Sequence, residues 1–193
     1  MSRLLRRTLM GVVPLVVGLA LCSAWATTAL HVTDLEQAGL STAVVVVTVG
    51  AAEVAKHDRY ETIVTRTTLR VEEVLYGSAP VELELQQIGG TIGEKTVHIP
   101  GDAVFKRGER CVLFLRQHDG RWYLTAMEQS KYRLVEDPRF GLLMERKLGD
   151  GIVTRDEQGS LVGYVEPIQR PIKRLESFRA QLARLSAGAE GQK

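Results

Sequence analysis

Residues 61–75 read Glu-Thr-Ile-Val-Thr-Arg-Thr-Thr-Leu-Arg-Val-Glu-Glu-Val-Leu, and this stretch decides the expected fold. Apolar and polar side chains alternate along it, with Ile63 and Leu69 on one face, as in a strand that covers a core. At residues 72–73 the alternation slips, so that Val74 falls in the formerly polar register. A β-bulge inserts one such extra residue, and bulges let a long strand bend around a barrel corner. The stretch therefore favours a small barrel over a sandwich.

The sequence on both sides of this stretch is also rich in strand signals. Residues 43–49, Ala-Val-Val-Val-Val-Thr-Val, form a continuous β-branched run that is typical of a strand covered on both faces. Residues 81–86 alternate strictly, and His118-Asp119-Gly120 has the composition of a hairpin turn. Strands at short, even spacing favour a mainly β fold, a closed or partly open OB-like barrel, because closure removes exposed edges. Further strands are expected over residues 96–99, 110–116, 121–127 and 132–135.

Helices are expected near both ends of the folded part. Thr33-Asp34-Leu35-Glu36 is a capping box that begins a short helix, which Gly39 ends. The signal weakens after residue 137, where a short meander of strands is expected. An apolar stripe at helical spacing then predicts an amphipathic C-terminal helix that packs on the barrel. The meander covers residues 141–148, 151–154 and 161–166, and the stripe consists of Ile172, Leu175, Phe178, Leu182 and Leu185.

Residues 1–26 have the pattern of a secretory signal peptide. Three arginines precede a short apolar run, and residues 24–26, Ala-Trp-Ala, supply the small-x-small pattern for cleavage after Ala26. The run is too short to span a membrane, so no transmembrane segment is expected in the mature chain. Lipidation of Cys22 is the minority alternative, because Leu21 stands where lipoprotein signals carry a small residue. The protein is therefore expected to be exported, to the periplasm or beyond the cell.

Cleavage after the leader would leave 167 residues, the size of one ordinary domain. We expect a β-barrel over residues 27–136, the meander and helix over residues 137–186, and a disordered tail over residues 187–193. Without the leader the chain carries 22 basic and 23 acidic residues. This near-neutral balance gives no field to attract nucleic acid, so no nucleic-acid partner is expected.

Cys111 is the sole cysteine outside the leader, so no internal disulfide is expected. It lies in the apolar run Cys-Val-Leu-Phe-Leu at residues 111–115. A thiol in such a strand is hidden and its pKa is raised by burial. We therefore expect Cys111 to be a buried, unreactive side chain and neither a nucleophile nor an intermolecular bridge.

Three patterns in the sequence resemble a phosphate-binding, a catalytic or a metal-binding motif, but none has the spacing or context that such a motif requires. Residues 89–96, Gly-Gly-Thr-Ile-Gly-Glu-Lys-Thr, lack the glycine spacing and the following helix of a phosphate-binding loop, so they are read as a flexible connection between strands. Glu82 and Glu84 share a strand face, which is more typical of a solvated outer face than of a catalytic pair. The four histidines have no zinc-ligand spacing, so no metal or cofactor is expected; they are His31, His57, His98 and His118. Sequence reasoning therefore selects no catalytic, cofactor-binding or metal-binding residue.

Basic side chains accompany the terminal helix, and two interpretations are open. They could meet anionic lipid or a partner. Arginines on the outer side of an amphipathic helix are more often simply solvated. The residues concerned are Arg170, Lys173, Arg174, Arg179 and Arg184.

Three strings in the barrel region resemble a group of bacterial exported proteins of unknown activity. They are residues 43–49, residues 68–77 (Thr-Leu-Arg-Val-Glu-Glu-Val-Leu-Tyr-Gly) and residues 105–115 (Phe-Lys-Arg-Gly-Glu-Arg-Cys-Val-Leu-Phe-Leu). The resemblance implies export and a β-rich domain. The same rhythm is distantly similar to the netrin-like, OB-type barrels of metalloproteinase inhibitors. Those inhibitors chelate zinc through an N-terminal cysteine, which this chain lacks after cleavage, so their mechanism is not transferred.

These observations predict a non-enzymatic exported binding or accessory domain with an unknown protein or polymer partner. One alternative is a regulator or inhibitor of an exported protease, which rests on the netrin-like resemblance. A second alternative is an envelope hydrolase built on carboxylates that are distant in sequence.

Overall fold

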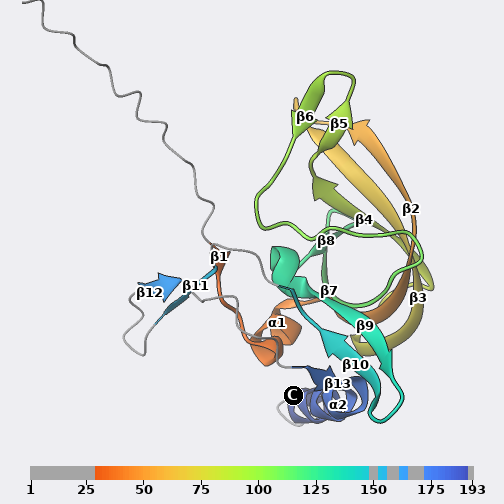
Figure 1. Cartoon of the computed structure of the whole chain (residues 1–193), viewed down its shortest axis with the longest axis vertical. Helices are drawn as coiled ribbons and strands as arrows, with labels where there is room; N and C mark the ends of the chain where they lie inside the picture. The colour runs from red at the N-terminus through yellow and green to blue at the C-terminus, as the bar shows by residue number, and fades with distance from the viewer. Residues whose placement is uncertain (1–28, 148–151, 156–160, 165–171, 191–193) are drawn as a thin grey trace, which may run out of the picture.

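The computed structural model describes residues 29–147, 152–155, 161–164 and 172–190, and it is mainly β (Figure 1). The expected signal peptide and Cys22 lie outside these residues. Eight strands form the largest sheet, in the order β13–β10–β9–β7–β2–β3–β4–β8. Their bounds are Ala43–Lys56 (β2), Ile63–Gly77 (β3), Glu82–Ile88 (β4), Arg110–His118 (β7), Arg121–Leu124 (β8), Lys131–Asp137 (β9), Gly141–Glu145 (β10) and Lys173–Arg174 (β13).

The pairings of five of these strands form a circuit. β2 pairs with β3, β3 with β4 and β4 with β8, and β8 returns to pair with β7, the other neighbour of β2. The pairing between β4 and β8 is parallel and consists of one register pair, Leu85 with Trp122. Arg121 of β8 adds a side-chain contact to this pairing, because its guanidinium donates to Gln86 of β4 at 2.8 Å. The same guanidinium also pairs with Asp58. We call these five strands the ring.

The bends predicted in the long strand are present. Val46 faces Glu73 across the β2–β3 ladder while Val47 faces Val71, so residue 72 is the extra residue of the predicted slip. The predicted β7–β8 turn is also confirmed, since Asp119 and Gly120 both have positive φ, at 49° and 73°. Two residues in this conformation make the type I′ turn that suits the twist of a hairpin.

Two apolar cores lie on opposite sides of β2 and β7. As predicted, residues 43–47 are buried on both faces, each at most 2% exposed. Alternate residues such as Val45 and Leu113 enter the ring core, while Val44 and Phe114 enter the helix-side core. The ring core contains Ala43, Val45, Val47, Val49, Leu69, Leu83, Leu85, Ala103, Cys111, Leu113, Leu115, Trp122 and Leu124. The helix-side core contains Ala38, Val44, Val46, Val112, Phe114, Tyr132, Met144, Leu175, Phe178 and Leu182.

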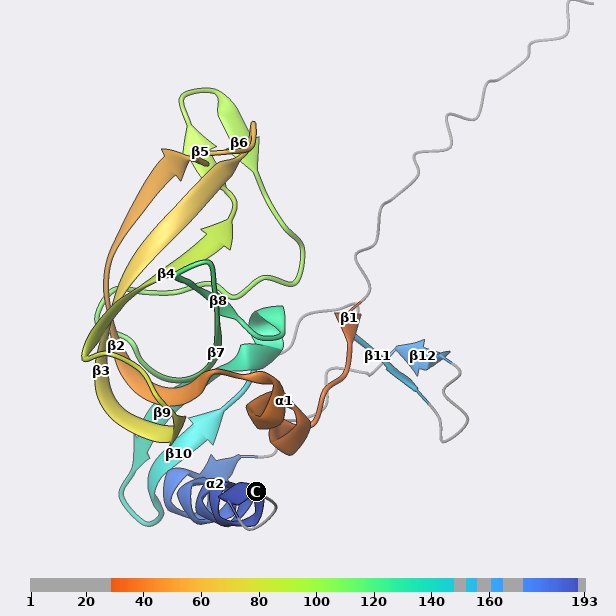
Figure 2. The ribbon, with the colours of Figure 1, turned by 180° about the vertical axis from the view of Figure 1, so that it is seen from behind.

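Both predicted helices are present and cover the helix-side core (Figure 2). Helix α1 (Asp34–Leu40) begins with the predicted capping box, in which the Thr33 hydroxyl and the Glu36 carboxylate each bind the other residue's backbone. Helix α2 (Leu175–Glu190) buries Phe178, whose ring centroid lies 5.9 Å from that of Phe114. In the predicted stripe Leu175, Phe178 and Leu182 are buried and Leu185 is partly buried, but Ile172 precedes the helix and is 55% exposed. The helix also continues through residues 187–190, which the sequence analysis assigned to the tail.

The strands after residue 137 do not form one meander, which corrects that expectation. β10 pairs with β9 and β13. β11 (Ile152–Arg155) instead pairs with β12 (Leu161–Tyr164) and, in parallel, with β1 (Ala29–Leu30), which makes a separate small sheet. No local pattern in the sequence predicts that β11 would pair with a strand at residues 29–30.

The glycine-rich residues 89–96 are also more ordered than expected. β5 (Gly90–Ile92) and β6 (Lys95–Val97) pair as a short hairpin rather than a flexible connection. A strand follows the glycines where a phosphate-binding loop needs a helix, so the structure supports rejecting that motif.

Candidate functional site

A long irregular connection, residues 98–109, joins β6 to β7 and runs across the ring (Figure 1). We call it the strap. Ala103 is 8% exposed and Phe105 packs against the ring core. Gln87 of β4 donates from Nε2 to the Ala103 carbonyl at 2.8 Å, and Lys131 donates from Nζ to the Val104 carbonyl. These contacts hold the strap over the ring core.

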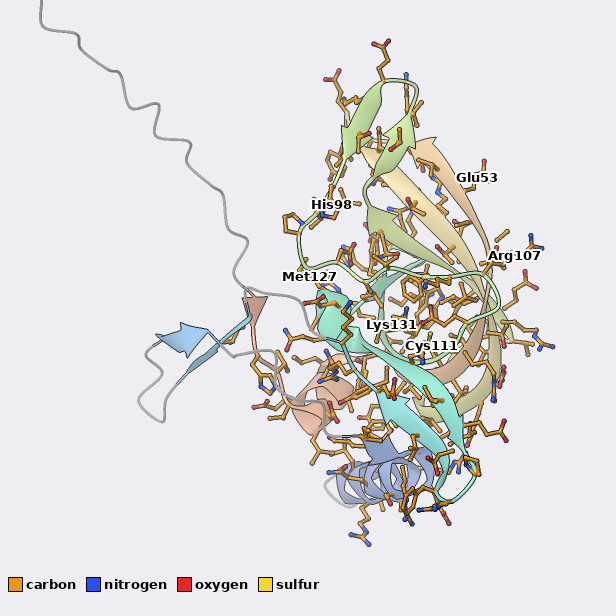
Figure 3. All side chains as sticks on the ribbon, in the orientation of Figure 1. Glu53, His98, Arg107, Cys111, Met127 and Lys131 are labelled. Atoms are coloured by element: carbon orange, nitrogen blue, oxygen red, sulfur yellow. The ribbon has the colours of Figure 1, made fainter. Side chains whose placement is uncertain are left out.

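A cleft of about 490 Å³ opens between the strap and the β9–β10 pair. Its wall carries charges of both signs together with Val104, which is 75% exposed. Helix η1 (Met127–Ser130) contributes one lining residue, and Figure 3 labels Met127 and Lys131 where η1 leads into β9. The lining residues are Asp102, Ala103, Val104, Lys106, Glu109, Glu128, Lys131, Arg133, Glu145, Arg146 and Lys147.

Ion pairs fix several of these charges in place. Lys131 Nζ lies 2.8 Å from Glu109 Oε2, with the two side chains only 14% and 12% exposed, and 4.7 Å from the centroid of the Phe105 ring. Arg133 and Glu145 face each other across the β9–β10 ladder with 3.7 Å between their charged atoms. Charges held in this way need little reorganisation when a ligand arrives.

One residue of the cleft wall, Arg146, also belongs to a buried ionic network. Arg146 lines the cleft and donates from Nη2 to Asp34 Oδ1 at 2.8 Å, and its guanidinium lies 4.0 Å from the centroid of the Tyr132 ring. The Tyr132 hydroxyl donates to both Asp34 oxygens, at 2.8 and 2.9 Å, and Lys173 Nζ also binds this carboxylate. Arg146 Nε is buried without a hydrogen-bond partner among the described residues.

Asp34 is ionised in this network. Burial alone would raise the pKa of its carboxyl, but the charge of Arg146 and the hydrogen bonds from Lys173 and Tyr132 hold the pKa below its usual range. Burial raises the pKa of the Tyr132 hydroxyl, so Tyr132 stays a neutral donor.

Asp102 is a half-buried carboxyl group in the wall of the cleft. Burial raises its pKa, although Gln87 and the backbone N–H of Ala103 oppose the shift. The Ala103 N–H donates to Asp102 Oδ1 at 2.8 Å. A cleft carboxyl with a raised pKa is a candidate for proton transfer.

The candidates Glu82, Glu84, Cys111 and His57 do not line the cleft. Glu82 and Glu84 are exposed on the outer face of β4, as expected, with the Glu84 side chain 61% exposed. Cys111 is fully buried in the ring core, and burial raises its pKa to about 12. His57 accepts backbone N–H bonds from Arg59 and Tyr60 and stabilises the β2–β3 turn.

Three basic residues at the terminal helix make contacts within the protein. Arg179 forms a bidentate pair with Glu73 of β3, with both distances 2.7 Å. Arg174 lies 4.7 Å from the centroid of the Phe140 ring, and Lys173 belongs to the Asp34 network. These contacts favour a structural role over lipid binding. Arg170 lies outside the described residues.

No helix in the described part of the chain has the length and hydrophobicity to cross a membrane. Within the same residues, no three His, Cys, Asp or Glu side chains are placed to hold a metal ion.

Comparison of the chain with family models, with curated proteins and with solved structures found no match. The resemblance to exported proteins and to netrin-like barrels therefore stays a prediction. So do the two alternatives of a protease regulator and an envelope hydrolase.

Sequence reasoning did not identify the cleft. Its residues come from the strap, from η1 and from the segment 131–147, so no local motif unites them. One feature of the sequence pointed to the strap. Its residues show no strand alternation, yet they include the apolar side chains Val104 and Phe105. Binding residues are disproportionately found on loops that a rigid scaffold positions.

Proposed function

We propose that this chain is an exported, non-enzymatic binding domain on an OB-like barrel, and that the cleft beside the strap is its contact site. The barrel proposal rests on the closed circuit of ring pairings, in which β2 is paired on both sides up to Val49. The observation that carries the binding proposal is the cleft itself, whose fixed charges and exposed Val104 offer both polar and apolar contacts.

The charge pattern of the cleft favours a polypeptide segment or polymer with charges of both signs. Glu109 and Glu145 are balanced by Lys131 and Arg133, so the wall is not dominated by one sign. A partner that carries a single sign of charge would meet repulsion at half of these groups.

A paired charge reversal tests the proposal. Lys106 and Lys147 are exposed at the cleft, so the variant Lys106→Glu/Lys147→Glu should fold normally and lose most of its binding to exported proteins or polymers. The matched control is Arg139→Glu/Arg184→Glu, which changes the same charge at exposed positions outside the cleft. Quantitative affinity capture from the exported proteome, followed by titration of the purified captured component, measures the effect. Equal binding by the two variants would contradict the proposal.

Asp102 supports a second candidate, a hydrolase that uses this carboxyl as a general acid. In that case the purified protein would turn over glycoside or ester substrates, and Asp102→Asn would abolish turnover while leaving binding intact. Turnover that Asp102→Asn removes would replace the binding proposal by the enzymatic one.

A further inference from the structure

Among the described residues, only β3 pairs with the upper part of β2, residues 51–56. β7 accompanies β2 up to the register pair of Thr48 with Arg110. Two more backbone bonds extend this ladder, from Val49 N–H to the Glu109 carbonyl at 2.9 Å and from Gly108 N–H to the Val49 carbonyl at 2.8 Å. Gly108 then takes a φ of +82° and the strap leaves the sheet.

β3 continues to pair with β2 beyond this point, from Ala52 with Thr67 to Lys56 with Ile63. Among the described residues no strand pairs with the opposite edge of residues 51–56. Figures 1 and 2 both show this part of β2 along the outer border of the ribbon, with β3 on its inner side. Its outward N–H and C=O groups are therefore open to another strand.

The side chains along this edge leave room for such a strand. Residues 51–54 are exposed and small or β-branched, apart from Glu53, and residue 55 is a half-buried alanine. Side chains in a strand point to the two faces of the sheet, so Glu53 and Lys56 do not block the hydrogen-bonding edge.

The two faces of the sheet at this edge differ in chemistry, so a strand that paired here would need different side chains on each face. Val54 is 39% exposed on the face that carries Gly90, because a Cβ added to Gly90 would lie 2.6 Å from Val54 Cγ1. Glu53 lies on the opposite face and in register with Arg66. Arg66 forms its ion pairs with Asp58, at 3.1 Å, and Glu84. Within the described residues Glu53 has no ion-pair partner.

We propose that residues 51–56 bind an extended segment of a partner polypeptide, which adds to the sheet as an antiparallel strand. The segment places an apolar side chain beside Val54 and a basic side chain beside Glu53. Strand addition takes its affinity from main-chain hydrogen bonds and its specificity from alternate side chains. This edge is separate from the cleft, so it is a second interaction surface.

The experiment uses the peptide acetyl-VKVKVKV-amide as probe, titrated into the ¹⁵N-labelled protein. We expect chemical-shift changes and slower amide exchange confined to residues 51–56 and their neighbours. Glu53→Lys should weaken binding of this peptide about fivefold and strengthen binding of acetyl-VEVEVEV-amide by a similar factor. Glu176→Lys, an equal charge change on α2, should alter neither affinity. Lys106→Glu/Lys147→Glu should also leave both affinities unchanged, which separates this proposal from that of the cleft.

Two results would overturn the proposal. The first is peptide binding that leaves the amides of residues 51–56 unprotected, or that Glu53→Lys does not change. The second is protection of the same amides without peptide together with a dimer in sedimentation analysis, because a second copy of this chain would then occupy the edge.

Discussion

The ring core and the helix-side core share β2 and β7 but differ in what else they bury. The ring core is aliphatic except for Cys111 and Trp122. The helix-side core packs three aromatic rings, and beside it lies the ionic network of Asp34, Arg146 and Lys173. The residues of the ring core lie between positions 43 and 124, whereas those of the helix-side core lie between positions 38 and 182. The comparison teaches that the two faces of one sheet can bury cores that depend on different lengths of the chain, since only the helix-side core needs residues beyond position 124.

Phe178→Ala tests whether the helix-side core is essential to the fold. Phe178 is 1% exposed and packs against Phe114 and Tyr132, so its truncation should lower the free energy of unfolding by about 3–5 kcal/mol. Thermal melting of the purified protein without lipid or partner measures this loss. Ile172→Ala, from the same sequence stripe but 55% exposed, should change the melt very little. An unchanged melt for Phe178→Ala would make α2 an interaction helix instead.

Asp34→Asn tests the ionic network. The substitution leaves Arg146, 7% exposed, without its counter-charge, while Lys173 can turn to solvent. We expect a loss of about 3 kcal/mol, measured by denaturant unfolding. Asp119→Asn, at an exposed turn, serves as the control. A loss below that of the control would show that the network adds nothing to stability.

The pH dependence of that difference sharpens the comparison. The folded state lowers the pKa of Asp34 from 3.8, so its stabilising contribution is complete above about pH 4 and is lost as the pH falls through the lower folded pKa. The stability gap between the wild type and Asp34→Asn should therefore be constant from pH 5 to 7 and shrink below pH 4. A gap that grows on acidification would contradict the assigned charge.

Thiol reagents should not reach the Cys111 side chain in the ring core of the folded protein. In a chain that carries Cys22→Ser, the Cys111 thiol should give almost no reaction with Ellman's reagent at pH 8, because burial raises its pKa to about 12 and hides the sulfur. Denaturation should restore one full equivalent of thiol. Immediate reaction of the native protein would show that the ring opens readily.

The smallest effect is expected at the surface of the helix-side region. Arg179 pairs with Glu73 at 2.7 Å, but both side chains are more than a third exposed. Arg179→Gln should therefore cost less than about 1 kcal/mol, and the cost should fall further in high salt. A loss comparable to that of Phe178→Ala would mean that this pair, rather than apolar packing, attaches α2.

The strands of the ring could be predicted from sequence because each of their signals is local. Strand alternation, the slip at residues 72–73 and the turn at residues 118–120 are all visible within a few residues. The apolar face of α2 was equally visible. The cleft and the Asp34 network could not be predicted, because Asp34 reads only as the first residue of a capped helix. Its binding to Tyr132, Arg146 and Lys173 depends on how α1, β9 and β13 meet, which no local pattern encodes.

The Asp34 network also has a consequence for the order of folding. Its members span from residue 34 to residue 173, so the network cannot close until almost the whole chain has been synthesised. The ring pairings end at residue 124, and contacts between residues close in sequence form faster than distant ones. During synthesis all strands of the ring are therefore complete before Lys173, which the Asp34 network requires, has been added.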